Sequence, residues 1–275
     1  MISLTDFIVV IPVYNEASRI RDTVYRLTQI LDSHTIDYLL ILAVDPSEDS
    51  SELVCDSLIA DFPKIRVLRG SERSGRGLAV RRAWTEYDAN LYSFIDADMS
   101  ADEFSLYRAY EVMRNGKFDV LIGSRYTNGS RTTRPPLRRV ISFSYNILLN
   151  IIFRDGISDH QCGLKIISDN VKTQMLSSTK VNSWFWDTEL VVLAASRGYK
   201  ICEMPLHWNE SKYKRTPILR LVKDVIIHGW GMVLLYKRLK YWSAPLLHWA
   251  KLANKEEGKI LKERSQIEGG PEGKQ

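Results

Sequence analysis

Two carboxylates one residue apart, Asp96 and Asp98, are the side chains in this sequence with the clearest chemical potential. They follow a short apolar run, Leu91–Ile95, which is typical of a buried strand. Residues i and i+2 of an extended segment point to the same side, where two carboxylates repel unless a cation lies between them. Hard divalent ions take carboxylate ligands together with substrate phosphates. The pair therefore indicates a metal–diphosphate site; the alternative is an Asp-rich turn after a strand.

The elements that would position this pair alternate between strand and helix. Apolar β-rich runs are separated by segments with helical periodicity, which predicts an α/β fold with a mostly parallel, twisted sheet covered on both faces. In such sheets ligands bind beyond the carboxyl ends of the strands. The predicted strands are 7–12, 38–44, 65–69, 91–95, 119–124 and 200–206, and the predicted helices include 15–31, 50–62, 103–114, 136–153 and 219–239.

Composition narrows the classes of partner. The 275 residues carry a formal net charge of +5, which suits acidic partners such as nucleotides, phosphates and anionic lipid. No module of interleaved basic and aromatic residues supports nucleic-acid binding. The three cysteines have no metal-ligand spacing and fit a reduced cytoplasmic setting. The amino terminus predicts a first strand rather than a signal peptide, and no run of 18 apolar residues predicts a membrane span.

The chain changes character after Arg125. The segment TNGSRTTRPPLRR is basic and rich in turn residues, which predicts a mobile loop. Near the other end, apolar residues with Lys237, Arg238 and Lys240 at one end are typical of a helix in a membrane interface, or of one packed on its own core. We expect a main domain over 1–217, an amphipathic helical extension over 218–250 that could associate with a membrane, and a polar disordered tail over 251–275.

Six motifs follow one another along the chain: IPVYNE (11–16), DPSEDS (45–50), GRGLAVRRAW (75–84), DADMS (96–100), GSRY (123–126) and DHQCGLK (159–165). Together they resemble family 2 glycosyltransferases, and most closely the polyprenyl-phosphate sugar synthases such as dolichyl-phosphate mannose or glucose synthases. The resemblance covers about residues 5 to 215. It implies a GT-A fold, a UDP- or GDP-linked sugar donor, Mg²⁺ or Mn²⁺, and inversion at the anomeric carbon.

On the donor side, the resemblance implies that the ends of the first two strands line the nucleoside pocket and that a glycine loop meets the diphosphate. Asp96 and Asp98 would hold the metal, and Asp98 is favoured as the residue that coordinates the ion directly. Val44 and Pro46 depart from the family's usual acidic and glycine positions, which leaves the base open, and Ser211 replaces an arginine of the mannose branch. The nucleotide-sugar candidates are Pro12, Tyr14, Glu16, Asp45, Arg76, Asp96 and Lys212.

On the acceptor side, Arg125, Arg138 and Ser142 match positions that meet the lipid phosphate in similar synthases. Guanidinium groups suit phosphate because their donors form a fixed fork. Asp159 and Gln161 would line the sugar or acceptor site. If the acceptor were instead a hydroxyl of a glycan, Asp159 would be the general-base candidate.

The resulting hypothesis is transfer of a sugar to a polyprenyl or dolichyl phosphate at the cytoplasmic face of a membrane, with peripheral membrane contact. A hydroxyl acceptor on the same fold is the alternative within enzymes. A nucleotide-binding scaffold without catalysis is the alternative of another class, and Asp96, Asp98 and Arg125 argue against it. The sequence gives no indication of oligomeric state.

Overall fold

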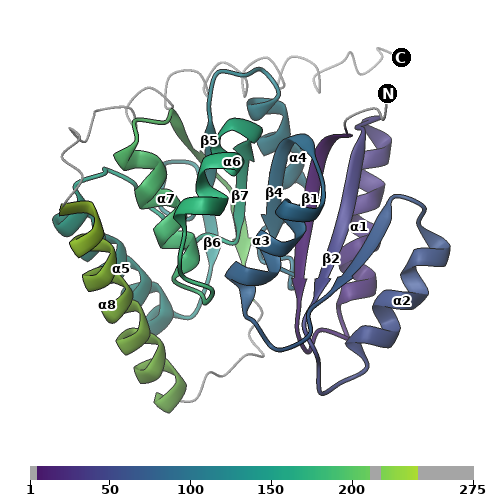
Figure 1. The fold of residues 1–275 in the computed structure, drawn as a ribbon, viewed down its shortest axis with the longest axis horizontal. Coiled ribbons are helices and arrows are strands. Elements are labelled where there is room, and N and C mark those ends of the chain that lie inside the picture. The colour runs from purple at the N-terminus through teal and green to yellow at the C-terminus, as the bar shows by residue number, and fades with distance from the viewer. Residues whose placement is uncertain (1–4, 211–217, 241–275) are drawn as a thin grey trace, which may run out of the picture.

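A seven-stranded sheet forms the centre of the protein in a computed structural model, which describes residues 5–210 and 218–240 (Figure 1). The strand order is β3-β2-β1-β4-β7-β5-β8, and only β7 runs antiparallel to its neighbours. The GT-A-like, mostly parallel α/β fold expected from the sequence is confirmed. The strands are β1 (Thr5–Val13), β2 (Tyr38–Val44), β3 (Ile65–Arg69), β4 (Ala89–Ile95), β5 (Val120–Ser124), β7 (Leu164–Ser168) and β8 (Ile201–Pro205).

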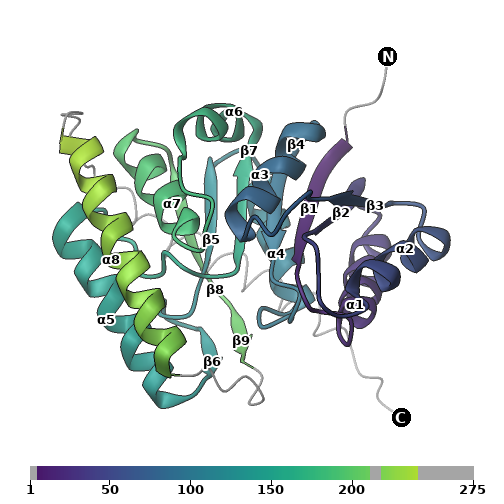
Figure 2. The same ribbon diagram turned by 60° about the horizontal axis from the view of Figure 1, so that its bottom comes forward.

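Helices cover both faces of this sheet (Figure 2). Helix α1 contacts α2 and α4 on one face, while α3, α6 and α7 contact one another on the other. Strands covered on both sides should be apolar throughout, and Phe7–Ile11 is fully buried as this rule requires. The helices are α1 (Ile20–Ser33), α2 (Ser51–Asp61), α3 (Arg76–Glu86), α4 (Glu103–Met113), α5 (Pro136–Phe153), α6 (Asp169–Ser178), α7 (Trp186–Ser196) and α8 (Ile218–Lys240).

The reversed strand β7 matters for the site because of where it begins. It lies between β4 and β5, so the residues just before it reach the edge at which those two strands end. The amide of Asp96 donates to the carbonyl of Gly163 at 3.2 Å across this junction. The turn from Asp159 to Gly163 is thereby held beside the end of β4.

Two local expectations are wrong. The first helix begins at Ile20 and not at residue 15, because residues 14–19 form a turn in which Asn15 has a left-handed φ of 55°. The basic segment after Arg125 is not simply a loop: it contains β6 (Arg131–Thr133), which pairs in parallel with β9 (His207–Asn209). A three-residue strand whose partner lies far along the chain leaves no local signal.

Helix α8 lies beside α5 at one end of the molecule (Figures 1 and 2). Its inner face packs through Met232 and Leu235, and Gly231 lies so close to Phe185 that an added Cβ would be 2.6 Å from the ring. Among the described residues, no helix is both long and apolar enough to cross a membrane. The predicted domain boundaries stay predictions, and Lys212, residues 241–250 and the predicted tail lie outside the described residues.

Candidate active site

The ends of β1 and β2 are joined by hydrogen bonds between their loops. The Asn15 amide donates to Ser47 Oγ at 3.2 Å, and Asn15 Oδ1 accepts from the Glu48 amide at 2.8 Å. The Tyr14 hydroxyl donates to Glu48 Oε1 at 3.2 Å, while the Arg73 guanidinium lies 3.9 Å from the centre of the Tyr14 ring. Tyr14, which is predicted to line the nucleoside pocket, is thus held in a partly exposed wall that the loops after β1 and β2 form at the carboxyl ends of the strands.

Pro12 and Glu16 flank this wall. Pro12 is the half-buried penultimate residue of β1. The Glu16 amide donates to Ser51 Oγ at 2.8 Å, and Glu16 Oε2 forms an ion pair with Arg19 at 3.2 Å. These contacts fix the backbone between β1 and α1. That Pro12 and Glu16 contact a nucleoside stays a prediction.

Asp45, at the end of β2, is already engaged by the protein. Its buried carboxylate accepts hydrogen bonds from the Ser74 amide and hydroxyl, both at 2.9 Å, and from the Gly75 amide at 3.0 Å. Arg82 lies 3.6 Å away. Asp45 therefore supports the glycine loop before α3, and a direct bond to a base or ribose would have to share these donors.

Two glycines place Arg76 at the first position of α3. Gly75 has a φ of 82°, which favours glycine, and a Cβ on Gly77 would lie 2.5 Å from Cβ of Trp186. The Arg76 guanidinium donates to Asp96 Oδ1 at 2.8 Å. The structure thus brings the loop expected to meet the diphosphate into direct contact with the carboxylate expected to hold the metal.

The Asp96 carboxylate lies in a space that only glycine leaves open. A Cβ added to Gly163 would be 2.0 Å from Asp96 Oδ2, so the absence of that atom forms the cradle. Asp98 follows in a turn closed by the Met99 amide on the Asp96 carbonyl at 3.1 Å, and its Oδ1 accepts from the Ser100 amide at 3.1 Å. The two carboxylates are thus set by a turn and not by an extended strand.

This donor set fits a divalent ion that takes its remaining ligands from a substrate. The Asp96 side chain is 22% exposed, so a ligand can reach it. Among the described residues, no group of three or more His, Cys, Asp or Glu side chains is placed to hold a metal ion. Mg²⁺ and Mn²⁺ sites built from one or two carboxylates and substrate phosphates have this character.

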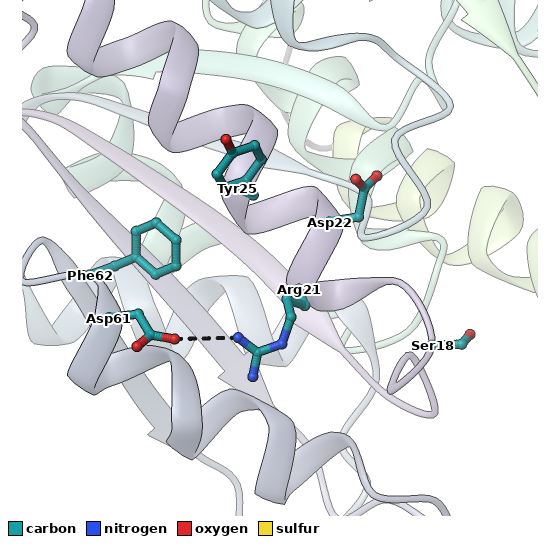
Figure 3. A pocket seen from close by; sticks show the side chains of 6 residues that line it. All are labelled: Ser18, Arg21, Asp22, Tyr25, Asp61 and Phe62. Atoms are coloured by element: carbon teal, nitrogen blue, oxygen red, sulfur yellow. Dashed lines mark hydrogen bonds and ion pairs between the residues drawn. The ribbon is translucent and has the colours of Figure 1, made fainter.

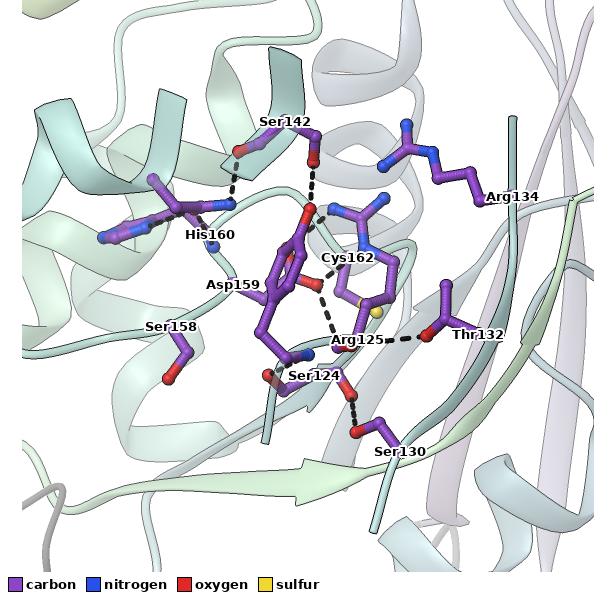
Figure 4. Close-up of polar contacts among 12 residues, drawn as sticks. Ser124, Arg125, Ser130, Thr132, Arg134, Ser142, Ser158, Asp159, His160 and Cys162 are labelled. Carbon is purple, nitrogen blue, oxygen red and sulfur yellow. Dashed lines mark hydrogen bonds and ion pairs between the residues drawn. The ribbon is translucent and has the colours of Figure 1, made fainter. Parts of the chain in front are cut away.

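On the far side of the edge, Arg125 at the end of β5 is paired with Asp159. Its Nε and Nη2 each lie 2.7 Å from an Asp159 oxygen, and its amide donates to Oδ2 at 3.0 Å (Figure 4). Burial favours a raised pKa for Asp159, but the Arg125 guanidinium outweighs it and lowers that pKa. Asp159 is 0% exposed, so it is not accessible as a general base for an acceptor hydroxyl.

Two more arginines surround Glu210 next to this pair. Arg138 and Arg134 both form ion pairs with the Glu210 carboxylate, Arg134 through Nε at 2.5 Å. Burial and the charge of Arg125 lower the pKa of Arg134, and its buried Nη1 has no hydrogen-bond partner among the described residues. Two guanidinium groups against the single Glu210 carboxylate leave an excess positive charge here. Arg134 was not singled out from the sequence, since its Arg-Pro-Pro context predicts only a turn.

We define the arginine cluster as Arg125, Arg134 and Arg138. Ser142 and Gln161 are the other residues named for the acceptor side. Ser142, labelled in Figure 4, is buried, and its Oγ is 2.6 Å from the Tyr126 hydroxyl. Gln161 Nε2 is 3.4 Å from His228 Nδ1 on α8. The predicted acceptor residues therefore gather in one region, and α8 reaches its border.

Sequence reasoning missed a buried pair of charges beneath Asp96. Asp187, in the first turn of α7, forms an ion pair with Arg76, and Lys165 Nζ lies 3.9 Å from the same carboxylate. Burial lowers the pKa of the fully buried Lys165 to about 7. Asp187 and Lys165 each stand next to apolar residues in the sequence, and a single charged residue beside an apolar run does not indicate an ion pair.

A shallow hollow lies elsewhere, along α1 and the end of α2 (Figure 3). It is lined by Arg21, Asp22, Tyr25, Asp61 and Phe62, with Ser18 at its border, and Arg21 pairs with Asp61 at 3.3 Å. None of the predicted site residues lines it.

Glycosyltransferases are among the proteins to which this chain is similar. Glycosyltransferase AglD of Haloferax volcanii is 33% identical over 223 residues, which cover 80% of this chain and 35% of that protein, so the chain spans about a third of AglD. Dolichyl-phosphate beta-glucosyltransferase ALG5C of Trichomonas vaginalis is 27% identical, covering 85% and 72%. The dolichyl-phosphate beta-glucosyltransferase of Saccharomyces cerevisiae is 25% identical, covering 80% and 72%.

Solved structures share the fold. Glucosyl-3-phosphoglycerate synthase from Mycobacterium tuberculosis, in complex with Mn²⁺, UDP and phosphoglyceric acid, superposes with a TM-score of 0.66 at 17% identity, covering 84% of this chain and 78% of that one. The family model described as glycosyl transferase family 2 matches residues 8–172, which include both candidate metal ligands and the paired Arg125 and Asp159. The chain therefore belongs to glycosyl transferase family 2 and is a glycosyltransferase.

Proposed function

We propose that this enzyme transfers a hexosyl group, with inversion and with Mg²⁺ or Mn²⁺, from a nucleotide sugar to a polyprenyl or dolichyl phosphate. The observation that carries the proposal is the arginine cluster on the acceptor side of the Asp96–Asp98 turn. Relatives named dolichyl-phosphate beta-glucosyltransferases and fold neighbours in complex with UDP-glucose support UDP-glucose as the first donor to test, ahead of a GDP-sugar.

On the donor side, Asp96 and Asp98 would hold the ion, and the Arg76 loop would meet the diphosphate. A bound divalent ion offsets the negative charge that develops on the departing nucleoside diphosphate. Arg76 and the amide groups at the start of α3 favour an anion at the same place. The Tyr14 wall lies at the ends of β1 and β2, where a nucleoside would extend from that diphosphate.

On the acceptor side, the arginine cluster would bring a second anion to the sugar. A phosphate acceptor is already negatively charged and needs no strong base, which agrees with the complete burial of Asp159. Two anions repel, so a phosphate in this region is favoured by the excess positive charge around Glu210. The buried Nη1 of Arg134, which has no hydrogen-bond partner in the described part of the chain, suits it as well. A hydroxyl acceptor would require a base that Asp159 cannot supply from its position.

Peripheral membrane contact would deliver the lipid. Adjacent helices α5 and α8 expose large apolar side chains, and exposed Arg139 and Lys237 accompany them. Such helices bind at the interface of anionic bilayers. The three cysteines, all within the described residues, form no disulfide, which suits the reducing cytoplasmic face. The exposed apolar residues are Leu137, Val140, Phe143, Ile147, Leu148 and Ile151 on α5, and Val225, Ile226, Ile227, Trp230, Val233, Leu234 and Tyr236 on α8.

Transfer of radiolabelled sugar from a panel of UDP- and GDP-sugars to polyprenyl phosphate tests the reaction, with Mn²⁺, with Mg²⁺ and with EDTA. We expect a metal-dependent lipid product that Asp98→Ala abolishes and that Arg134→Gln reduces through a higher KM for the lipid phosphate. Arg21→Gln, in an exposed ion pair along α1, is the matched control. Product formed only with a glycan hydroxyl would favour the alternative acceptor, and UDP binding without any transfer would favour the scaffold.

Flotation with vesicles tests the membrane contact separately. We expect the full chain to float with vesicles containing anionic lipid, and Trp230→Glu to reduce the floated fraction, because this 62% exposed ring would enter the interface. Leu53→Glu, which changes a 73% exposed apolar residue on α2, should leave flotation unchanged. Equal flotation of all three proteins would contradict a role for α8.

A further inference from the structure

Arg76 bridges two carboxylates that differ in their access to solvent. One guanidinium nitrogen, Nη1, lies 2.8 Å from Asp96 Oδ1, and the other, Nη2, forms an ion pair with Asp187. The Asp187 side chain is 1% exposed and Asp96 is 22% exposed. The inner ion pair is therefore sealed inside the protein, whereas the outer one faces the space where a ligand would bind.

Packing holds the guanidinium in this bridging position. The Trp184 ring lies 4.1 Å from the guanidinium carbon of Arg76, and the Phe94 ring lies 5.5 Å from it. Backbone contacts fix the helix start as well, because the Leu78 amide donates to the Asn182 carbonyl at 3.2 Å and Gly77 lies against Trp186. The side chain can exchange its outer partner while its inner end stays in place.

The inner carboxylate has a second cation nearby. Lys165 Nζ is 3.9 Å from Asp187 and donates to the Cys162 carbonyl at 2.7 Å, with 0% exposure. In its protonated form Lys165 adds positive charge beside Asp187, next to the ion pair that Arg76 makes with the same carboxylate. If Arg76 released Asp96, Asp187 would remain compensated, while Asp96 would be left as an accessible carboxylate in need of a cation.

We infer that Arg76 is an internal stand-in for the divalent cation: it neutralises Asp96 when no metal is bound, and transfers its outer nitrogen to the diphosphate when a metal–nucleotide complex arrives. The inference rests on the metal site of the proposed function. Arg76 is the positioning residue and Asp187 the anchor about which its guanidinium turns. A metal ion alone must compete with Arg76 for Asp96, whereas a metal ion with a diphosphate offers Arg76 a new anion.

Metal and nucleotide binding should therefore be coupled. A bound nucleotide diphosphate draws Arg76 away from Asp96 and so favours metal binding, and a bound metal ion frees Arg76 for the diphosphate. Each ligand therefore raises the affinity for the other by the same factor, as thermodynamics requires. Arg76→Lys keeps a positive charge near Asp187, but a single ammonium group cannot bridge two carboxylates as a guanidinium does. Asp187→Asn removes the inner partner and leaves Arg76 to pair with Asp96 alone. The two variants should shift metal affinity in opposite directions.

The test is titration of the full chain with Mn²⁺, followed by calorimetry or electron paramagnetic resonance, without and with UDP. We expect Arg76→Lys to bind Mn²⁺ alone on the order of tenfold more tightly than the unmodified protein, and the enhancement by UDP to shrink by a similar factor. Asp187→Asn should bind Mn²⁺ alone more weakly. Arg21→Lys, in the exposed pair of Figure 3, is the control and should change neither value.

Unchanged affinity for Mn²⁺ alone in a folded Arg76→Lys variant overturns the inference, and so does weakening in both variants, which simple structural damage would cause. If Arg76→Lys does not fold, Asp187→Asn decides: weaker binding of Mn²⁺ alone supports the inference and unchanged binding overturns it. Failure of the unmodified protein to bind Mn²⁺ even with UDP is a different result, because it removes the proposed metal site itself.

Discussion

Replacing Gly163 by alanine should disable the active site while leaving most of the fold intact. The new Cβ would lie 2.0 Å from Asp96 Oδ2, whereas ordinary contact begins near 3.4 Å, so the carboxylate must retreat by about 1.4 Å. The backbone at Gly163 is not left-handed, so alanine adds no backbone strain. Displacing a reacting-site group by about 1 Å costs on the order of 100-fold in rate.

Gly163→Ala should lower the free energy of unfolding only modestly compared with its effect on the rate. Forcing one methyl group into a packed site costs about 1–3 kcal/mol, and here it meets the movable end of a side chain. The assay is sugar transfer from UDP-glucose to polyprenyl phosphate at saturating Mn²⁺, beside urea unfolding of the same preparations. Gly229→Ala is the matched control, because a Cβ there meets nothing within 4 Å. A folded Gly163→Ala enzyme with turnover within threefold of the unmodified protein would refute the reasoning.

Three further changes test the interior. Asp159→Asn leaves the buried Arg125 without its charged partner, so urea unfolding at pH 7 should show a loss of about 3–5 kcal/mol; a loss below about 1 kcal/mol would contradict the pairing. Burial lowers the pKa of Lys165 from 10.5 to about 7, so between these values the unfolded chain binds more protons and the free energy of unfolding should rise with pH. Urea unfolding at pH 7, 8 and 9 should show a contribution of up to about 1.4 kcal/mol per pH unit, which Lys165→Met removes; identical slopes in both proteins would disprove it. Gly231→Ala should push α8 off the aromatic ring beneath it and speed limited proteolysis of that helix, whereas Gly229→Ala should not; equal cleavage of the two variants would count against this packing.

Much of the fold could be predicted because its signals are local. The strands Tyr38–Val44 and Ile65–Arg69 and the helix Pro136–Phe153 have the bounds expected from apolar runs, turn residues and Pro-Pro. The expected layering also follows, since alternation of strand and helix permits few other arrangements. The reversed direction of β7 and the β6–β9 pair could not be predicted in this way, because strand partners far apart in sequence leave no trace in periodicity.

For the candidate site, too, the residues could be predicted from the sequence but their contacts could not. Asp96, Asp98, Arg76 and Arg125 could be selected from residue type, spacing and position at strand ends. Their interactions could not: Asp45 is engaged by a glycine loop, and Asp159, a base candidate by type, is buried against Arg125. Whether a carboxylate is accessible depends on which distant groups surround it, and residue type alone does not encode that.

The sequence by itself determined the order of the elements, the family and the chemical groups available at the edge of the sheet. Only the tertiary structure decided which charges meet. The contact of Arg76 with both Asp96 and Asp187 depends on α3 and α7 starting at the same place, which Gly77 permits by leaving room for Trp186. Local propensity acts over a few residues, whereas ion pairing and burial depend on distance in space, so these contacts exist only once the sheet and its helices have assembled.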